Sequence, residues 1–414
     1  MRQSDVIVIG GGFAGLTAAA VAAKRGKTVT VLSKGVGTLT ISGGTIDLLG
    51  CGSDGRPFAS PAAGLALVDP DHPYSKIGKE AVQAAVDFFL DLCETAGFPY
   101  RGNLQGMKWI PTAAGTIKPT CLVPKTMDTA PLAETDTVYA VGFHCLKDYY
   151  PHIVAKNLQK LPGYDKTYHI AMVDPRFTAG RDVSALDIAR WLDTESGRQD
   201  CIEQLRNTVK PGAVLLLPPV LGTRPDYQVL QELEQAVRCR IIETVALPPA
   251  MTGFRLRNLL LDHLKSAGVR IVEQAFVAKA IVENGRCLAV VTQNSDRERS
   301  YSAQAFILAN GGFYGGGLLA EPGKAVEPIF HLPVKAPASQ TQWSNPRLFS
   351  REQQPFAKIG IAVDSTLRPL AENGSLALEN VYIAGRSLAG YDFCFEKSGN
   401  GVALASGYQA AMMV

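Results

Sequence analysis

The sequence predicts an α/β fold in which both ends of the chain contribute to one parallel sheet. The first observation is a short apolar run, Asp5–Ile9, which leads directly into glycines and then into a helix-forming segment. The second is that two late apolar runs also lead into glycine turns: Ala305–Ala309 is followed by Asn310-Gly311-Gly312, and Val381–Ala384 by Gly385. Parallel strands carry their functional turns at one edge of the sheet. We therefore expect the late segments to return to the first domain.

A second domain is expected between these two ends. The first domain is predicted to comprise residues 1–50 plus 251–414, and residues 51–250 are predicted to form an inserted α+β cap. The chain has 414 residues, of which 46% are hydrophobic and 19% are charged. A chain of this size and composition can bury two or three cores.

The composition argues against several classes of protein. The net charge of +3 is too small to favour nucleic acid as a partner. No apolar run approaches the ~18–20 residues of a transmembrane segment, and the first strand starts too early for a signal peptide. The eight cysteines are scattered without a CxxC pair, which favours reduced thiols, a cytoplasmic location and no metal centre.

The N-terminal elements form a βαβ unit of Rossmann-like type. The run Asp5–Ile9 is typical of a strand that is covered on both faces. The alanine-rich segment Leu16–Lys24 predicts a helix, and the apolar run Thr28–Leu32 predicts the next parallel strand.

The turn between the first strand and the helix matches the pattern GxGxxG. Gly10 permits the tight turn, Gly12 lets the backbone approach a phosphate, and Gly15 lets helix and strand pack closely. The N-terminus of the helix offers free N–H groups and a partial positive charge to an anion. This setting predicts dinucleotide-type binding.

One part of the dinucleotide pattern is missing. An acidic residue is expected at the end of the second strand to hold a ribose, and Ser33 and Lys34 stand there instead. Three interpretations are open. Ser33 can hold the ribose more weakly, Lys34 can meet an extra phosphate, or the ligand is a mononucleotide without adenosine.

A second glycine-rich segment, Thr38–Asp47, follows the second strand. Its small side chains and many N–H donors suit contact with a flat ring, and a flexible loop is the alternative interpretation. The middle of the chain then mixes turns with the following expected elements: helices at Glu80–Ala96, Ser184–Asp193, Gln199–Val209 and Tyr227–Val237, and strands at Val138–Phe143, Tyr168–Val173 and 214–220.

The C-terminal third predicts further strands and a closing helix. A helix at Arg255–Gly268 precedes two β-prone runs, Arg270–Glu283 and Cys287–Thr292, which are separated by the hairpin turn Asn284-Gly285. Glycines flank the last predicted helix, Gly401–Met412. Flavoproteins of the two-dinucleotide type end in this way, with the last helix directed at the flavin.

The residue after the late strand glycine departs from that pattern. Such flavoproteins usually carry Asp there, and this chain carries Arg386, which can neutralise a phosphate. The residues expected to bind the cofactor are Gly10, Gly11, Gly12, Phe13, Ala14, Gly15, Ser33, Lys34, Ser42, Gly43, Gly44, Thr45, Val277, Ala309, Asn310, Gly311, Gly385, Arg386, Gly399, Asn400, Gly401 and Val402.

Segments over nearly the whole length resemble the B-subunit family of anaerobic glycerol-3-phosphate dehydrogenases. They are VIVIGGGFAGL, SGGTIDLL, GTIKPT, LPPAMTGFRLRNLL, AFILANGGFYGGGLLAEPGKAVEPIF and ENVYIAGRSLAGYD. The resemblance implies an FMN-containing subunit that pairs with a catalytic FAD subunit, while a third, iron–sulfur subunit passes electrons to the membrane quinone pool. The implied reaction oxidises sn-glycerol 3-phosphate to dihydroxyacetone phosphate.

The identity of the flavin depends on two of these departures. Ser33 and Arg386 are compatible with FMN, which has no adenosine ribose to hold. The GxGxxG turn can accept a pyrophosphate and so leaves FAD open. We expect a flavin, with FMN preferred over FAD.

Oxidation of a phosphorylated alcohol requires a base for the hydroxyl proton and a cation for the phosphate. His144 is the candidate base, and Lys118 and Arg255 are candidate anion-binding residues, with Arg257 two residues further along. Ordinary structural roles are the alternative for each.

Two other functions stay open from the sequence. One is a stand-alone flavin-dependent oxidoreductase of another small substrate, and the other is a non-catalytic structural subunit. The chain carries no basic amphipathic helix, so we expect any attachment to the inner membrane to come through partner subunits.

Overall fold

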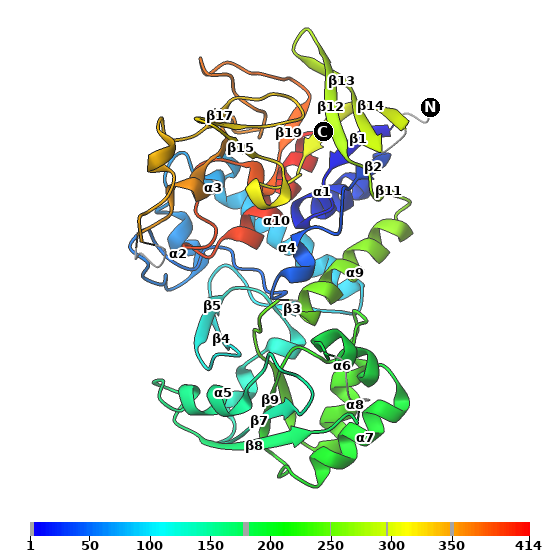
Figure 1. Ribbon diagram of the computed structural model, residues 1–414, viewed down its shortest axis with the longest axis vertical. Helices are drawn as coiled ribbons and strands as arrows, with labels where there is room; N and C mark the ends of the chain where they lie inside the picture. Colours follow the sequence, from blue (N-terminus) through cyan, green and yellow to red (C-terminus); the bar gives the residue numbers. More distant parts are fainter. Residues whose placement is uncertain (1–3, 177–181, 249, 295–296, 348–351) are drawn as a thin grey trace.

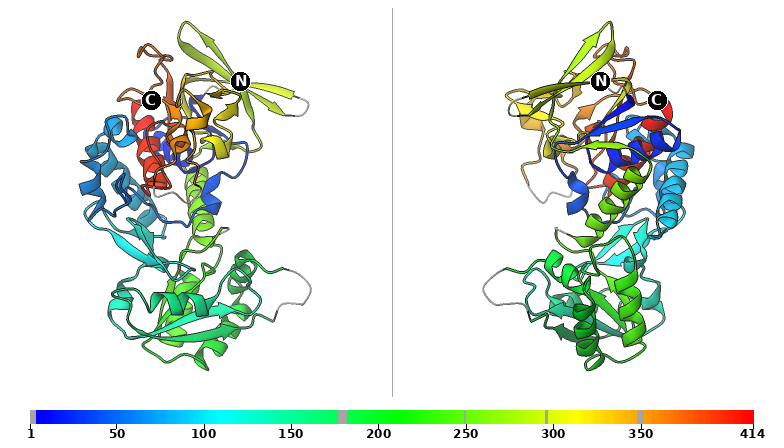
Figure 2. Two further views of the ribbon diagram at one scale, coloured as in Figure 1. Left: turned by 60° about the vertical axis from the view of Figure 1, so that its left-hand side comes forward. Right: turned by 90° about the vertical axis from the view of Figure 1, so that its right-hand side faces the viewer.

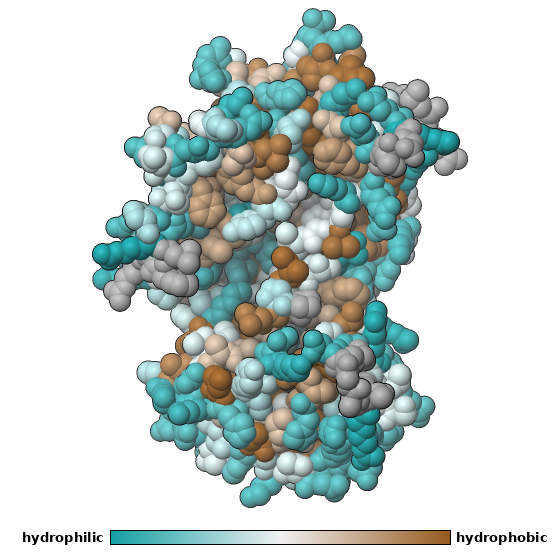
Figure 3. All heavy atoms as spheres, viewed as in Figure 1, coloured by the Kyte–Doolittle hydropathy of each residue, from teal (hydrophilic) through white to brown (hydrophobic). Residues whose placement is uncertain are grey.

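The computed structural model divides into a larger and a smaller part along its long axis (Figure 1). It describes residues 4–176, 182–248, 250–294, 297–347 and 352–414, so parts of both expected domain ranges, such as 1–3 and 177–181, lie outside the description. The two further views show the same division (Figure 2), and the outline narrows between the parts (Figure 3).

A seven-stranded sheet forms the centre of the larger part. Its order is β11-β2-β1-β14-β13-β12, with β19 paired to β14. The strands β11, β2, β1, β14 and β19 are parallel, whereas β12 and β13 continue the sheet in antiparallel pairing. The strands are β1 (Ser4–Ile9), β2 (Val29–Leu32), β11 (Arg270–Val272), β12 (Val277–Glu283), β13 (Arg286–Asn294), β14 (Arg297–Leu308) and β19 (Val381–Ile383).

Both ends of the chain meet beside this sheet, as the glycine-terminated runs predict. Helix α1 (Phe13–Lys24) packs along the last helix, α10 (Gly399–Met413), and both are apolar on nearly all sides because they are covered all round. The backbones approach closely, since a Cβ placed on Gly407 would lie 2.4 Å from the carbonyl oxygen of Ala14. Only glycine fits at this contact.

The smaller part is built on a four-stranded sheet with the order β10-β9-β7-β8. All its pairings are parallel, so the sheet of the expected α+β cap is more regular than that description implies. Its strands are β7 (Thr137–Phe143), β8 (Thr167–Val173), β9 (Val214–Leu217) and β10 (Arg240–Glu243). Its helices are α5 (Pro151–Leu158), α6 (Ala185–Leu192), α7 (Glu195–Arg206) and α8 (Gln228–Val237).

Three further groups of elements complete the chain. The helices α2 (Pro61–Leu65), α3 (Pro73–Ile77) and α4 (Lys79–Thr95) fall within the range expected for the insertion, yet α3 and α4 pack against α10 of the larger part. Helix α9 (Met251–Ser266) lies between the two parts (Figure 1). The short ribbons pair β3 (Tyr100–Arg101) with β6 (Val123–Pro124), β4 (Lys108–Pro111) with β5 (Ile117–Thr120), β15 (Leu319–Glu321) with β16 (Lys324–Val326), and β17 (Val334–Lys335) with β18 (Gly360–Ile361).

The largest differences from the expected elements occur between residues 270 and 309. The expected run Arg270–Glu283 divides into β11 and β12, because its first residues join the parallel sheet and its last residues join the antiparallel hairpin. The hairpin turn is confirmed, with positive φ angles of 49° at Asn284 and 76° at Gly285. Within the described residues, no helix combines the length and the apolar character that crossing a membrane requires.

Candidate functional site

Three glycine segments meet at the carboxyl ends of β1, β14 and β19. Gly10 has a φ of 121°, and a Cβ on it would lie 2.1 Å from the carbonyl oxygen of Ala309. A Cβ on Gly385 would lie 2.9 Å from Cβ of Ala14, and the amide of Gly385 donates to the hydroxyl of Ser406 in α10. The parallel sheet thus brings together the three turns that the sequence singled out.

The N-terminus of α1 is open on one side at Gly12. This residue precedes Phe13 at the start of the helix, and a Cβ built on Gly12 would meet no atom within 4 Å. Gly15, by contrast, is packed so tightly that its Cβ would lie 2.0 Å from the carbonyl oxygen of Gly10. The turn therefore combines close helix–strand packing with free backbone N–H groups, which is the arrangement that accepts a phosphate.

Ser387 joins two of the three turns. Its hydroxyl lies 3.2 Å from Oδ1 of Asn310 and 3.1 Å from the carbonyl oxygen of Gly311. Asn310 and Gly311 directly follow the buried Ala309 at the end of β14. This contact fixes the turn after β14 against the turn after β19.

The loop Ser42–Thr45 is held against the N-terminus of α10. The amide group of Asn400 donates to Oγ of Ser42 at 3.1 Å and to the carbonyl oxygen of Thr45 at 2.8 Å. The hydroxyl of Tyr100 donates to the carbonyl oxygen of Gly44 at 2.7 Å. Gly399, Gly401 and Val402 lie in the same first turn of α10, so the predicted loop and the predicted helix end form one surface.

Lys118 reaches this loop from β5. Its ammonium lies 2.6 Å from Oδ2 of Asp47 and donates to the hydroxyl of Thr45 at 3.0 Å. The other carboxylate oxygen of Asp47 accepts from Thr120 at 2.6 Å. The backbone carbonyl of Asp47 accepts from the amide of Gly401 in α10. Lys118 is therefore close to the candidate cofactor site, and it remains partly exposed.

Ser33 and Lys34 are placed differently from one another. The buried Ser33 donates its hydroxyl to the carbonyl oxygen of Gly35, and its side chain lies against Gly11. The exposed Lys34 places its ammonium 4.9 Å from the centre of the Phe276 ring, next to Val277 at the start of β12. The ammonium is thus held by an aromatic ring rather than by a carboxylate.

Arg386 carries an atom without a partner. Its guanidinium lies over the ring of Phe393, and its Nη1 atom is buried with no hydrogen-bond partner among the described residues. Burial lowers the pKa of this guanidinium below its usual value. A buried donor without an acceptor costs about 1–3 kcal/mol. Nη1 is therefore free to donate to an acceptor that the described residues do not supply, such as an oxygen of an anionic ligand.

Two residues predicted to take part in chemistry lie elsewhere. His144 is exposed at the end of β7, in the smaller sheet, and is not brought to the glycine turns. Arg255 is fully buried and bound bidentately by the equally buried Glu243, with Nη2–oxygen distances of 2.7 and 2.6 Å. Its assignment to substrate binding is therefore wrong, because its guanidinium reaches neither solvent nor the candidate site. Arg257 donates to the carbonyl oxygen of Val36.

Three residues that sequence reasoning did not select support the site directly. They are Asp47, Tyr100 and Thr252, which contact the loop Ser42–Thr45 or its neighbours. Asp47 is the last residue of the glycine-rich segment Thr38–Asp47. A carboxylate two residues after the hydroxyl of Thr45 is a sequence feature that indicates a polar contact there. Tyr100 lies outside every segment singled out from the sequence, and Thr252 lies in LPPAMTGFRLRNLL, far from the glycine loop along the chain, so only the folded chain shows their contacts with that loop.

Comparison with known proteins places the chain among flavoproteins. Residues 5–402 match the family described as FAD binding domain. This description does not support the expected preference for FMN over FAD. The B subunit of anaerobic glycerol-3-phosphate dehydrogenase from Yersinia pseudotuberculosis serotype I is 32% identical over 97% of this chain and 96% of the relative. The protein of the same name from Vibrio cholerae serotype O1 is 29% identical over 100% of this chain and 97% of the relative.

Among solved structures, 3-ketosteroid Δ1-dehydrogenase from Sterolibacterium denitrificans aligns with the whole chain and with 99% of its own, at 13% identity and a TM-score of 0.46. L-proline dehydrogenase from P. horikoshii aligns with 99% of the chain and 92% of its own, at 14% identity and a TM-score of 0.35.

Proposed function

The chain belongs to the FAD binding domain family and, within it, to the B subunits of anaerobic glycerol-3-phosphate dehydrogenase. From that premise we propose that it is an FAD-carrying subunit of an enzyme that oxidises sn-glycerol 3-phosphate to dihydroxyacetone phosphate. The similarity extends over nearly the full length of the relatives, so it covers the smaller part as well as the glycine turns.

The observation that carries this proposal is the meeting of three strand ends around the open side of Gly12. The free amides at the start of α1 can bind a phosphate, and Arg386, in the turn after β19, has a buried Nη1 atom without an acceptor among the described residues. Because FAD carries a pyrophosphate and FMN a single phosphate, two positive groups at one end of the sheet favour FAD. The missing acidic residue at Ser33 then means a weaker hold on the ribose.

The chain's own residues have three tasks in this reaction. The flavin, when bound, would supply an acceptor for the electrons released when the assembled enzyme oxidises the substrate hydroxyl. The loop Ser42–Thr45 and the first turn of α10 would hold the ring. Lys118 keeps a positive charge beside that surface, where it can bind an anionic oxygen of the substrate, and Asp47 holds the ammonium in position.

Partner subunits complete the enzyme in this proposal. A catalytic FAD subunit is the partner for this chain, and an iron–sulfur subunit passes electrons to the quinone pool of the inner membrane. The chain would then lie on the cytoplasmic side and contact the membrane only through these partners.

Release of the cofactor from the purified protein by heat, followed by mass spectrometry, tests the first step of the proposal. We expect FAD, in stoichiometric amount. Anaerobic addition of glycerol 3-phosphate to the assembled complex should then bleach the flavin absorbance. Bleaching of this chain alone, without partners, would instead support a stand-alone oxidoreductase, and a colourless protein that takes up no flavin would support a structural subunit.

A further inference from the structure

The first turn of α9 lies directly against the glycine loop. Thr252, whose side chain is 1% exposed, donates its hydroxyl to the carbonyl oxygen of Gly43 at 2.8 Å. The next residue, Gly253, is so close that a Cβ on it would lie 2.3 Å from the carbonyl oxygen of Leu39 and 2.4 Å from that of Ser42. Backbone touches backbone here. The position of the loop therefore follows the position of this helical turn.

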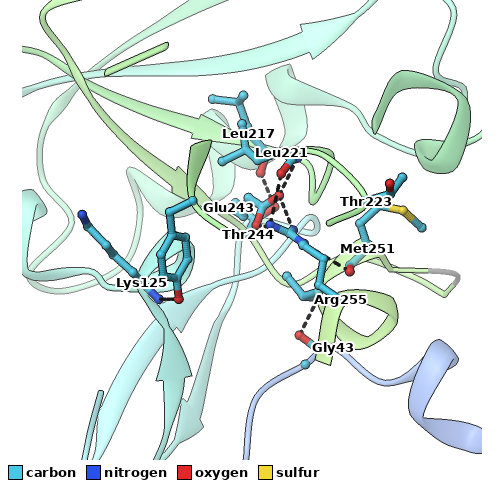
Figure 4. Close-up of polar contacts among 12 residues, drawn as sticks. Gly43, Lys125, Leu217, Leu221, Thr223, Glu243, Thr244, Met251 and Arg255 are labelled. Atoms are coloured by element: carbon cyan, nitrogen blue, oxygen red, sulfur yellow. Dashed lines mark hydrogen bonds and ion pairs between the residues drawn. The ribbon is translucent and has the colours of Figure 1, made fainter. Parts of the chain in front are cut away.

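A buried ion pair fixes this turn to the smaller sheet (Figure 4). Arg255 and Glu243 are both 0% exposed, and Nη2 of Arg255 lies 2.7 and 2.6 Å from the two carboxylate oxygens. The same guanidinium donates through Nε to the carbonyl oxygen of Met251 and through Nη1 to that of Leu221, each at 3.3 Å. Glu243 is the last residue of β10, and its Oε1 also accepts from the amide of Leu221 at 2.8 Å.

The chemistry of this pair makes the connection rigid. Two charges removed from water have no low-energy alternative partners, so they hold one arrangement. The planar guanidinium also binds the carboxylate in a fork, which fixes its orientation as well as its distance. The carboxyl end of β10 thus sets where the first turn of α9 lies, and that turn sets the peptide planes of the glycine loop.

We propose that Thr252 is a positioning residue for the flavin, held in place by the Arg255–Glu243 ion pair. Its hydroxyl fixes the Gly43 carbonyl, and with it the orientation in which the loop Ser42–Thr45 meets the ring. The smaller sheet therefore contributes to the cofactor environment although none of its strands reaches the glycine turns. This inference rests on the proposed binding of FAD.

The test compares three variants of the full-length protein. Thr252→Val removes the hydroxyl with little change of volume, and Thr252→Ser keeps a hydroxyl. Thr244→Val removes an equally buried hydroxyl, which lies 3.2 Å from the carbonyl oxygen of Leu217 and does not contact the loop. For each variant, the dissociation constant of FAD, the visible circular dichroism of the bound flavin and the melting temperature of the apoprotein are measured.

We expect Thr252→Val to weaken FAD binding about five- to tenfold and to change the visible circular dichroism, because one hydrogen bond is worth ~1 kcal/mol. Thr252→Ser should restore both, and Thr244→Val should leave both as in the wild type even if it lowers the melting temperature. Equal FAD binding and equal dichroism in Thr252→Val and wild type would overturn the inference alone. A wild-type protein that takes up no FAD would overturn the proposed function together with it.

Discussion

The ammonium of Lys118 and the carboxylate of Asp47 are 2.6 Å apart and join β5 to the end of the glycine loop. Thr120, in the same strand, donates to the other oxygen of this carboxylate. The ribbon β4–β5 thereby reaches from the inserted segment to the first turn of α10. Four polar side chains, Thr45, Asp47, Lys118 and Thr120, form one connected group beside the candidate cofactor site.

Replacement of Lys118 should lower the rate of flavin reduction without preventing the protein from folding. We expect Lys118→Met to slow flavin reduction by glycerol 3-phosphate in the complex about tenfold or more, because a charge-assisted hydrogen bond is worth ~1.5–3 kcal/mol. His144→Gln is the matched control and should leave the rate unchanged, since His144 is exposed at the end of β7. Stopped-flow absorbance measures both rates. A normal rate in Lys118→Met would remove this residue from the reaction.

Replacement of two glycines of the first turn by alanine should affect different properties: stability at Gly10 and FAD binding at Gly12. Gly10→Ala should destabilise the apoprotein by about 3 kcal/mol or more, because its φ is positive and its Cβ would strike the Ala309 carbonyl. Gly12→Ala should leave the melting temperature unchanged, since the added methyl group meets open space, and should weaken FAD binding at least about tenfold. Unchanged FAD binding in Gly12→Ala would place the cofactor elsewhere.

Arg386 should matter to the loaded protein more than to the empty one. We expect Arg386→Met to weaken FAD binding about tenfold to a hundredfold, because a hydrogen bond to a charged group is worth ~1.5–3 kcal/mol. The apoprotein should lose little stability, since Nη1 has no hydrogen-bond partner to lose among the described residues and an apolar Met side chain can keep the contact with the Phe393 ring. Titration calorimetry with FAD and thermal melting measure the two effects. Arg386→Lys keeps the charge and should bind FAD more tightly than Arg386→Met, with a difference that shrinks at high salt.

The turn at residues 364–368, which follows β18, should give a pH-dependent contribution to stability. Burial alone would raise the pKa of Asp364, but hydrogen bonds from Thr366 and Arg368 outweigh it and hold the pKa below the usual 3.8. A carboxyl group whose pKa is lower in the folded state stabilises the fold fully at pH values above its pKa in the unfolded chain. This stabilisation is lost as the pH falls through the pKa of the folded state.

Asp364→Asn should therefore cost about 1 kcal/mol in the free energy of unfolding near neutral pH. The difference from the wild type should shrink progressively as the solution is acidified below the usual carboxyl pKa. Urea unfolding at a series of pH values measures it, and Asp165→Asn, at an exposed position, is the control. A difference that is constant over the whole pH range would show that the carboxylate charge contributes nothing.

The buried ion pair offers a double-mutant cycle. Arg255→Met alone leaves the Glu243 carboxylate buried and unpaired, which should cost about 3–5 kcal/mol. Combination with Glu243→Leu removes the second charge, and we expect the double variant to recover about 2 kcal/mol relative to the sum of the single changes. Chemical denaturation of all four proteins gives the coupling. Additive losses would mean that the two side chains contribute independently.

Local patterns were sufficient for the larger sheet and its turns. An apolar run that leads into a glycine turn indicates both a strand and a close backbone contact after it. The sequence alone therefore predicts that the turns at Gly10, Asn310 and Gly385 lie at one edge of the sheet. The late strand β14 is longer than expected, because its first half is polar and partly exposed, so no continuous apolar run marks it.

The partners of charged side chains could not be predicted in the same way. Arg255 and Lys118 carry equal charge, yet one is fully buried against Glu243 and the other is partly exposed beside Asp47. Arg255 meets Glu243 because β10 of the smaller sheet ends beside α9, whereas Lys118 meets Asp47 because β5 lies beside the glycine loop. His144 follows a strand-like run, which makes it a candidate base from the sequence, but that strand belongs to the smaller sheet.

The packing of α10 against α1 has a consequence for how the protein is made. Residues 399–413 supply one wall of the glycine turns, and the ribosome makes them long after β1 and α1. During translation the early βαβ unit therefore lacks its packing against α10 until the whole smaller part has been synthesised. The glycine turns gain the wall supplied by α10 only once the smaller part has been made, so under the proposed function binding of FAD would follow the synthesis of that part.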